Sequence, residues 1–272
     1  MTGTNRFYFA LAATALLAFN LSACGKQESG NEANAPGKAT LLETIKSNGE
    51  ITIGTEGTYA PFTFHDKDGK LTGFDVQIAE EVAKRLGVKA KFIETNWDGM
   101  LAGLDAGRYN MVANEVTIKD DRKAKYDFSD PYIVSKAVLI VQEGNTDIKK
   151  LADLKGKKSG QSLTSNLADI AKANGAEIVQ IDGFNQAIDL LTSKRIDATI
   201  NDELSFLDLK KQRPDVPIKV VDETESASES GLLFQKGNAD LVSAVNKALA
   251  DMKADGTYLN ISKTYFGEDV SK

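Results

Sequence analysis

The chain is organised around the segment Tyr109-Asn110-Met111-Val112-Ala113-Asn114-Glu115-Val116-Thr117-Ile118-Lys119-Asp120-Asp121-Arg122. Its first half is apolar and typical of a buried strand. Polar groups that follow such a strand lie where a parallel sheet opens into a cleft. Arg122 can grip a carboxylate through two N–H groups, Thr117 can add a hydroxyl donor, and Glu115 can face an ammonium. The segment therefore suits the binding of a zwitterion.

The same segment also fits the start of an ordinary helix. In that interpretation Asp120 and Asp121 are the acidic residues of the first turn, which the helix dipole favours. Arg122 is then a solvated helix residue without a ligand. The segment alone does not decide between the two interpretations.

The second half of the chain repeats the pattern of the first. The matching pairs, all at one constant offset, are Trp97 and Phe184, Leu101 and Ile188, Leu104 and Leu191, Arg108 and Arg195, Asn110 and Asp197, Asn114 and Asn201, and Glu115 and Asp202. Any helix followed by a strand offers some matches of this kind, but a run in a single register indicates two lobes with the same local architecture. Glu115 and Asp202 would then both lie at the carboxyl ends of parallel strands, facing one cleft.

The order of elements predicts how these lobes are built. Residues 50–113 alternate strand and helix, which implies a right-handed parallel α/β layer. The β-forming runs 137–141 and 231–234 predict two crossings between the lobes, and two crossings make a hinge. We therefore predict an α/β fold of two similar lobes with parallel-type sheets joined by a two-stranded hinge. Residues 41–138 plus 234–272 form the first lobe, and residues 139–233 form the second, with the hinge strands at its ends.

Composition narrows the classes of function. The composition, 42% hydrophobic and 26% charged, is ordinary for a globular protein. A length of 272 residues is enough for one large or two modest domains. The formal charge is −6 and the lysines are scattered among acids, which argues against a nucleic-acid partner. The sequence offers no cluster of metal ligands and no nucleophile–histidine pair, and its one histidine, His65, falls in a predicted turn. We expect no metal, no cofactor and no catalytic residue.

The N-terminus predicts export and anchoring. Residues 1–23 contain Arg6 and then an apolar run too short for a comfortable membrane span, as in a signal peptide. The run ends in Leu21-Ser22-Ala23-Cys24, which resembles the bacterial lipobox, where the cysteine is acylated. A free thiol at Cys24 is the alternative. Residues 24–40 then comprise the acylated cysteine and a flexible tether, so we expect a lipoprotein held at a bacterial membrane, facing the periplasm or the cell exterior.

Several motifs resemble one family. They are the runs Gly54-Thr55-Glu56-Gly57-Thr58-Tyr59-Ala60-Pro61-Phe62, Gly73-Phe74-Asp75-Val76, Trp97-Asp98-Gly99-Met100-Leu101, Thr117-Ile118 with Arg122, Asp127-Phe128-Ser129-Asp130-Pro131-Tyr132, and Arg195-Ile196-Asp197-Ala198 with Asp202. Together, over nearly all of residues 41–270, they resemble the extracellular solute-binding proteins of polar amino-acid ABC importers. The resemblance implies the type II fold of periplasmic binding proteins.

The resemblance also implies roles for individual residues. Arg122 is similar to the family's arginine for the ligand α-carboxylate, and Asp202 to its aspartate for the α-ammonium, which leaves Glu115 to shape the pocket. Thr117, Thr164 and Ser165 resemble further contacts to the carboxylate, and Tyr59 and Trp97 the aromatic walls. Glu115, Asn114 and Thr164 depart from the commonest family residues. The predicted ligand-binding set is Glu56, Tyr59, Phe62, Trp97, Asn114, Glu115, Thr117, Arg122, Thr164, Ser165 and Asp202.

Within the family, the motifs around Glu56, Trp97 and Tyr126 are most similar to those of cystine- and cysteine-binding members. The expected ligand is cystine or cysteine, with another polar amino acid as the alternative. The expected partners are an ABC permease and the membrane that holds the Cys24 anchor, and we expect a monomer. Two other functions stay open: a sensor that reports to a receptor, and a dehydratase-type enzyme that uses Glu115 and Glu56 as acid and base.

Overall fold

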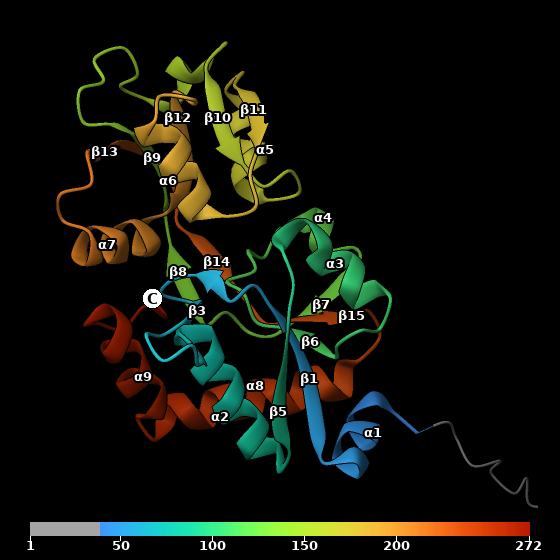
Figure 1. Cartoon of the computed structure of the whole chain (residues 1–272). Helices are drawn as coiled ribbons and strands as arrows, with labels where there is room; N and C mark the ends of the chain where they lie inside the picture. The colour runs from blue at the N-terminus through green and yellow to red at the C-terminus, as the bar shows by residue number, and fades with distance from the viewer. Residues whose placement is uncertain (1–38) are drawn as a thin grey trace, which may run out of the picture. The chain divides into compact units, whose positions relative to one another are not determined.

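Two five-stranded sheets with the same strand order organise residues 39–272, which are the residues that the computed structural model describes (Figure 1). The first sheet contains, in order, β5 (Lys89–Glu94), β1 (Glu50–Thr55), β6 (Met111–Val112), β15 (Leu233–Gln235) and β7 (Tyr126–Phe128). The second contains β11 (Glu177–Gln180), β10 (Lys158–Gln161), β12 (Ala198–Asp202), β9 (Ala137–Gln142) and β13 (Ile218–Glu223).

Each sheet begins with three parallel strands, and its fourth strand is antiparallel to both neighbours. The repeat explains this likeness. The number of residues from the start of α3 (Trp97–Asp105) to the start of α6 (Phe184–Thr192) equals the number from the start of β6 to the start of β12, the strands that follow these helices. The prediction of two similar α/β lobes with parallel-type sheets is confirmed.

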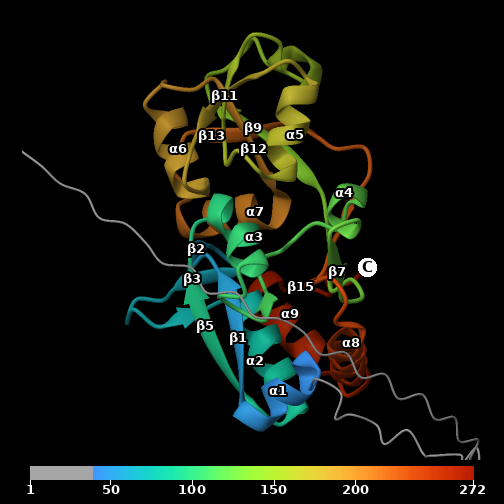
Figure 2. The same cartoon turned by 90° about the vertical axis from the view of Figure 1, so that its right-hand side faces the viewer.

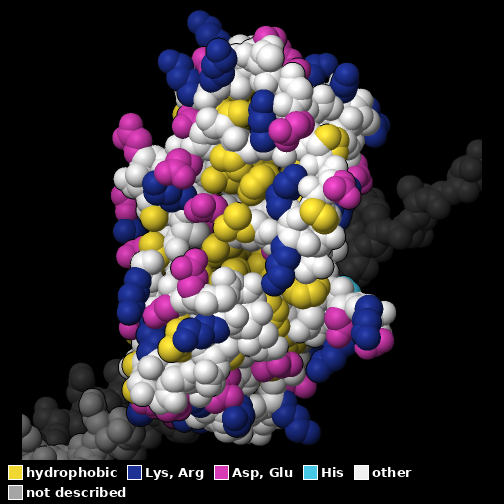
Figure 3. All heavy atoms as spheres, turned by 90° about the vertical axis from the view of Figure 1, so that its left-hand side faces the viewer, with side chains coloured by type: hydrophobic (Ala, Val, Ile, Leu, Met, Phe, Trp, Pro, Cys, Tyr) yellow, Lys and Arg dark blue, Asp and Glu magenta, His cyan; other side chains and the backbone are white. Residues whose placement is uncertain are grey.

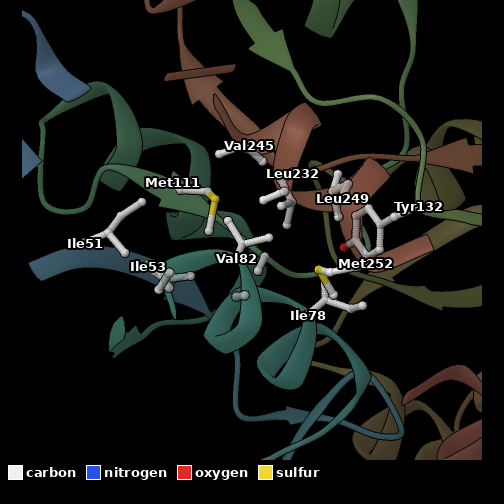
Figure 4. Packing of buried hydrophobic residues seen from close by; sticks show 14 of the residues in the cluster. Ile51, Ile53, Ile78, Val82, Met111, Tyr132, Leu232, Val245, Leu249 and Met252 are labelled. Atoms are coloured by element: carbon white, nitrogen blue, oxygen red, sulfur yellow. The ribbon is translucent and has the colours of Figure 1, made fainter. Parts of the chain in front are cut away.

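Six helices belong to the first lobe: α1 (Leu41–Asn48), α2 (Phe74–Leu86), α3, α4 (Asp120–Lys123), α8 (Ala239–Ala254) and α9 (Thr257–Phe266). Helix α2 ends at Gly87, whose φ of 79° is the left-handed conformation that glycine adopts without a Cβ clash. The main core of this lobe lies between the sheet, α2 and α8. Figure 4 shows its packing, with the labelled residues Ile51, Ile53, Ile78, Val82, Met111, Tyr132, Leu232, Val245, Leu249 and Met252 all buried.

The second lobe contains a 3₁₀ helix (Leu151–Leu154) and the helices α5 (Asn166–Ala173), α6 and α7 (Glu203–Gln212). Its strand β9 is buried on both faces, because Val138 and Ile140 belong to one core cluster while Leu139 and Val141 belong to another. A strand covered on both faces has a continuous apolar sequence rather than an alternating one. This explains the uninterrupted run that begins at Ala137.

The two lobes are joined by a ribbon of two antiparallel strands, β8 (Ile133–Ser135) and β14 (Ser228–Ser230), which lies between the sheets in Figure 1. The strands expected to cross, at 137–141 and 231–234, are instead part of the sheets: β9 begins at Ala137 in the second and β15 at Leu233 in the first. The reason is that strong apolar β-formers are needed inside a buried sheet, whereas the ribbon, in which only Ile133 belongs to a core cluster, tolerates serine.

A small third sheet positions an aromatic residue where the lobes meet. It consists of β2 (Thr58–Tyr59), β3 (Thr63–His65) and β4 (Leu71–Thr72). Tyr59 packs against core clusters of both lobes. Figure 2 shows α3 and α7 at the same level, between the bodies of the two lobes.

The surface of the described region carries charges of both signs. On the face in Figure 3, Lys and Arg side chains are interspersed with Asp and Glu over both lobes. Between residues 39 and 272, no helix is long and apolar enough to cross a membrane. The predicted signal peptide (1–23), Cys24 and the tether up to residue 38 lie outside the described residues.

Candidate ligand-binding cleft

A cleft of about 710 Å³, counted to its open mouth, lies between the lobes. The cleft is lined by Glu56, Tyr59, Trp97, Asn114, Glu115, Thr117, Ser135, Ala137, Gln161, Ser162, Ser165, Asn166, Leu167, Ile181, Gly183, Phe184, Thr199, Asn201, Asp202 and Ser228. Polar side chains from both lobes therefore face one space.

The first carboxylate of the cleft is Glu56, which follows β1. Asn114 fixes it on two sides: Asn114 Nδ2 donates to Glu56 Oε2 at 2.7 Å, and the Glu56 N–H donates to Asn114 Oδ1 at 2.8 Å. Burial raises the pKa of Glu56 to about 7, although Asn114 and the Trp97 backbone favour its ionised form. Among residues 39–272, no Lys or Arg lies within 4 Å of this carboxylate.

The second carboxylate, Glu115, is aimed by an unusual backbone. Its φ is 49°, a conformation that few non-glycine residues adopt, and its N–H donates to the buried carboxylate of Asp75. The Tyr59 hydroxyl lies 2.8 Å from Glu115 Oε2 and 3.0 Å from Asn201 Oδ1 on the other lobe. Burial, and then the charge of Asp202, raise the pKa of Glu115 well above its ordinary value.

The third carboxylate, Asp202, ends β12 and caps α7. The Leu204 N–H donates to its Oδ1 at 2.8 Å, and the Ser135 hydroxyl donates to its Oδ2. Burial raises the pKa of Asp202 to about 6 despite these hydrogen bonds. As with Glu56, no cation of the described region pairs with it.

The cation of the site is Arg122, which is only 3% exposed. Helix α4 does begin at Asp120, as the helix-start interpretation expects, but Arg122 is not a solvated residue of that helix. Its Nη1 donates to Thr117 O at 3.0 Å, and its guanidinium carbon lies 5.2 Å from the centre of the Trp97 ring. No carboxylate of the described chain lies within 4 Å of it. Burial without such a partner lowers the pKa of Arg122.

Direct hydrogen bonds cross from one lobe to the other. Asp98, in the first turn of α3, accepts the N–H of Leu163 at 3.2 Å, the N–H and hydroxyl of Thr164 at 3.0 and 2.9 Å, and Gln180 Nε2 at 3.3 Å. Ser205 donates to Ala60 O at 2.9 Å. These contacts require the lobes to be closed on each other.

Eight of the eleven predicted residues line the cleft: Glu56, Tyr59, Trp97, Asn114, Glu115, Thr117, Ser165 and Asp202. The other three do not. Phe62 is fully buried in the first-lobe core, where its ring supports Tyr59 at a centroid distance of 5.1 Å. Arg122 packs on the Trp97 ring and donates to Thr117 O, and its Nη2 lies 3.5 Å from Thr164 O of the second lobe. Thr164 has its N–H and hydroxyl already bound to Asp98, so its neighbour Ser165, the cap of α5, takes the place at the wall.

Sequence reasoning missed several lining residues. The repeat contained a signal for two of them, because Phe184 and Asn201 are the counterparts of the predicted Trp97 and Asn114 and both line the cleft. Gln161 and Thr199 come from β10 and β12, in which local sequence does not show which residue faces the cleft. Residues 39–272 contain no group of three or more His, Cys, Asp and Glu that could hold a metal ion.

The fold and the cleft define a class of protein: two similar α/β lobes, joined by a two-stranded hinge, that close over a polar cleft. The sequence profile of the bacterial extracellular solute-binding proteins, family 3, matches residues 51–268. The chain belongs to this family. Among its relatives is the L-cystine-binding protein TcyA of Bacillus subtilis (strain 168), which is 47% identical over 253 residues, covering 93% of this chain and 94% of that protein.

Two solved structures indicate the state of the lobes. An ancestral arginine-binding protein bound to arginine is 41% identical, with a TM-score of 0.76 over 80% of this chain and 98% of that one. The L-cystine solute receptor of Neisseria gonorrhoeae, in its unliganded open conformation, is 48% identical but has a TM-score of only 0.58 over 86% of this chain and 100% of that one. Higher identity with a lower score indicates a different disposition of the lobes, in agreement with the cross-lobe hydrogen bonds described above.

Proposed function

We propose that the cleft binds the zwitterionic head of an amino acid. One observation supports this above all. The buried Arg122 on the first lobe and the buried Asp202 on the second have no oppositely charged partner within the described chain. A buried charge without a partner costs several kcal/mol, and a ligand that carries both signs removes the cost on both lobes at once.

In this proposal Arg122 binds the α-carboxylate and Asp202 the α-ammonium. The Thr117 hydroxyl and the backbone beside Ser165 add donors to the carboxylate, and Tyr59 and Trp97 enclose the ligand. Arg122 reaches the ligand by a small shift of its guanidinium past Thr117, since the Nη1 to Thr117 O contact of 3.0 Å is a bond to neutral oxygen that a carboxylate outcompetes. Binding on one lobe followed by closure of the other gives a protein whose shape reports its occupancy.

The ligand that we favour is cystine, with cysteine or another polar amino acid as the alternative. Support comes from the relatives that are named for L-cystine binding. The protein would deliver this ligand to an ABC permease as a monomer held at the membrane through an acylated Cys24. A sensor that passes the closed shape to a receptor would use the same cleft.

The binding assignment is tested by a thermal-shift panel of the free amino acids and cystine, followed by titration calorimetry, because a ligand that binds the folded state raises its melting temperature. A response to cystine alone, or to cystine and cysteine, supports the assignment. Mass spectrometry of the ligand after incubation separates binding from catalysis, since a dehydratase would return product. An unresponsive panel would refute the function.

Delivery and anchoring need separate experiments. Loss of labelled-cystine uptake in cells without the protein supports transport, whereas unchanged uptake with a lost cystine response favours the sensor. A C24S variant, expressed in the native host, should no longer incorporate a palmitate analogue and should leave the membrane fraction.

A further inference from the structure

The cleft contains two carboxylates on the first lobe, Glu56 and Glu115, that the binding of a zwitterionic head by Arg122 and Asp202 does not require. Glu115 lies on the first lobe, Asp202 on the second, and both line the same space. The Tyr59 hydroxyl contacts Glu115 Oε2 and also Asn201, the residue next to Asp202. Closure therefore brings two carboxylates from opposite lobes together, with no Lys or Arg within 4 Å of either among residues 39–272.

The hinge ribbon contacts the carboxylate of Asp202 and the backbone carbonyl of Glu115. Ser135, at the end of β8, donates to Asp202 Oδ2, and Ser230, at the end of β14, donates to Glu115 O at 3.3 Å. Thr117 also pairs with Ser230 in an isolated β-bridge. A rotation at β8 and β14 must therefore change the separation of the two carboxylates.

The orientation of Glu115 is specified by its surroundings. Asp75 accepts the Glu115 N–H and stabilises the left-handed backbone there, while Tyr59 binds the side chain. Strained backbones are maintained where the surrounding structure fixes them, often at functional sites. An Asp75 carboxylate and the Arg122 cation are the other charges that act on Glu115, and Glu203 acts on Asp202.

We propose that Glu115 and Asp202 form a two-carboxylate gate. The gate opposes closure of the lobes in the ligand-free protein. The ammonium of the ligand removes this opposition by lying between the two carboxylates. The proposal rests on the proposed function and adds Glu115 as a residue that determines specificity. Where both carboxylates are ionised in the open protein, bringing them together in a poorly solvated cleft disfavours the closed state, because the like charges repel or one carboxylate must take up a proton. An ammonium between them is attracted by both carboxylates. The gate therefore raises the affinity for a ligand with an amino group relative to its desamino analogue.

The test uses E115Q, which removes the charge but keeps an oxygen for Tyr59. E115D keeps the charge and should shift the open–closed balance and the ligand preference in the same direction as wild type. E203Q removes the charge of Glu203, a neighbour of Asp202 that does not line the cleft. Small-angle X-ray scattering of each ligand-free protein at pH 8 and pH 5 gives the balance of open and closed forms. Calorimetry gives the Kd for L-cystine and for 3,3′-dithiodipropionate, which is cystine without its amino groups.

In E115Q we expect the ligand-free closed-to-open ratio at pH 8 to rise at least tenfold, and the preference for cystine over the desamino compound to fall at least tenfold. Wild type should compact on acidification from pH 8 to pH 5 more than E115Q does. The gate would be refuted, with cystine binding intact, if E115Q had the same scattering as wild type and E203Q. The same preference for cystine over the desamino compound in all three proteins would refute it as well.

Failure of the proposed function gives a different result. If another amino acid from the panel binds in place of cystine, the calorimetry uses that amino acid and its desamino analogue instead of cystine and 3,3′-dithiodipropionate. The exchange is valid because the gate recognises only the ammonium. The same tenfold criteria then decide. If the wild type binds no amino acid, the binding function and the gate are refuted together.

Discussion

The cross-lobe contacts of Asp98 give the sharpest prediction about affinity. The D98A substitution removes the acceptor of four hydrogen bonds that join α3 to the second lobe, at 2.9–3.3 Å, and Asp98 itself does not line the cleft. A hydrogen bond to a charged group contributes about 1.5–3 kcal/mol at most, but these are partly exposed, so about 0.5 kcal/mol each is the appropriate scale. The closed state should lose about 2 kcal/mol in total.

A loss of about 2 kcal/mol corresponds to a Kd about 30-fold weaker, because 1.4 kcal/mol is a factor of ten. The effect should fall on dissociation, since the open protein that captures the ligand does not make these bonds. Trp97, the only tryptophan in the chain, lies next to Asp98 and lines the cleft, so its fluorescence reports closure in a stopped-flow experiment. Q180A removes one donor and should weaken binding about twofold.

The matched control is D240A. Asp240 is a first-turn acid of α8, as Asp98 is of α3, and its Oδ1 accepts the Leu241 N–H at 2.8 Å. Both substitutions lose the favourable interaction of an acid with the helix dipole, about 0.3–1 kcal/mol, but only D98A loses contacts between the lobes. A D98A protein with the dissociation rate of D240A would refute the assignment of Asp98 as a closing contact.

Four further predictions concern the site and the core. Arg122→Leu should abolish amino-acid binding in calorimetry with little change in melting temperature, because an apolar residue fits beside Trp97 while the cation for the carboxylate is lost; retained affinity would contradict its role. Ligand affinity should fall about tenfold between pH 8 and pH 5, as Asp202, with its pKa raised to about 6, becomes protonated; calorimetry in buffers of different ionisation enthalpy should show proton release on binding. The same raised pKa stabilises the ligand-free fold at acidic pH, and this contribution is lost as the pH rises through about 6, which a melting series without ligand should reveal. Gly73→Ala should destabilise the protein by about 3 kcal/mol or more, since the added Cβ lies 2.2 Å from Phe62 O at a φ of 131°; a melting temperature within 2–3 °C of wild type, as a shift of about 1 kcal/mol gives, would contradict it.

The sequence by itself determined the two-lobed α/β architecture. Apolar spacing and glycine stops placed helices such as Phe74–Leu86, and the constant offset between Trp97 and Phe184 predicted a second lobe like the first. These features are local or periodic, so one chain suffices to read them. Part of the cleft, eight of its twenty lining residues, was predictable for the same reason, because polar residues after buried strands collect at one edge of a parallel sheet.

Only the tertiary structure decided which groups meet across the cleft. The hinge could not be placed from β-forming runs, because those runs mark buried sheet strands, and the ribbon uses the less apolar Ile133–Ser135 and Ser228–Ser230. The roles of Asp98 and Asp75 depend on partners 66 and 40 residues away in the chain. The pairing of Glu115 with Asp202 depends on the angle between the lobes, which a hinge leaves free and contacts between distant residues determine.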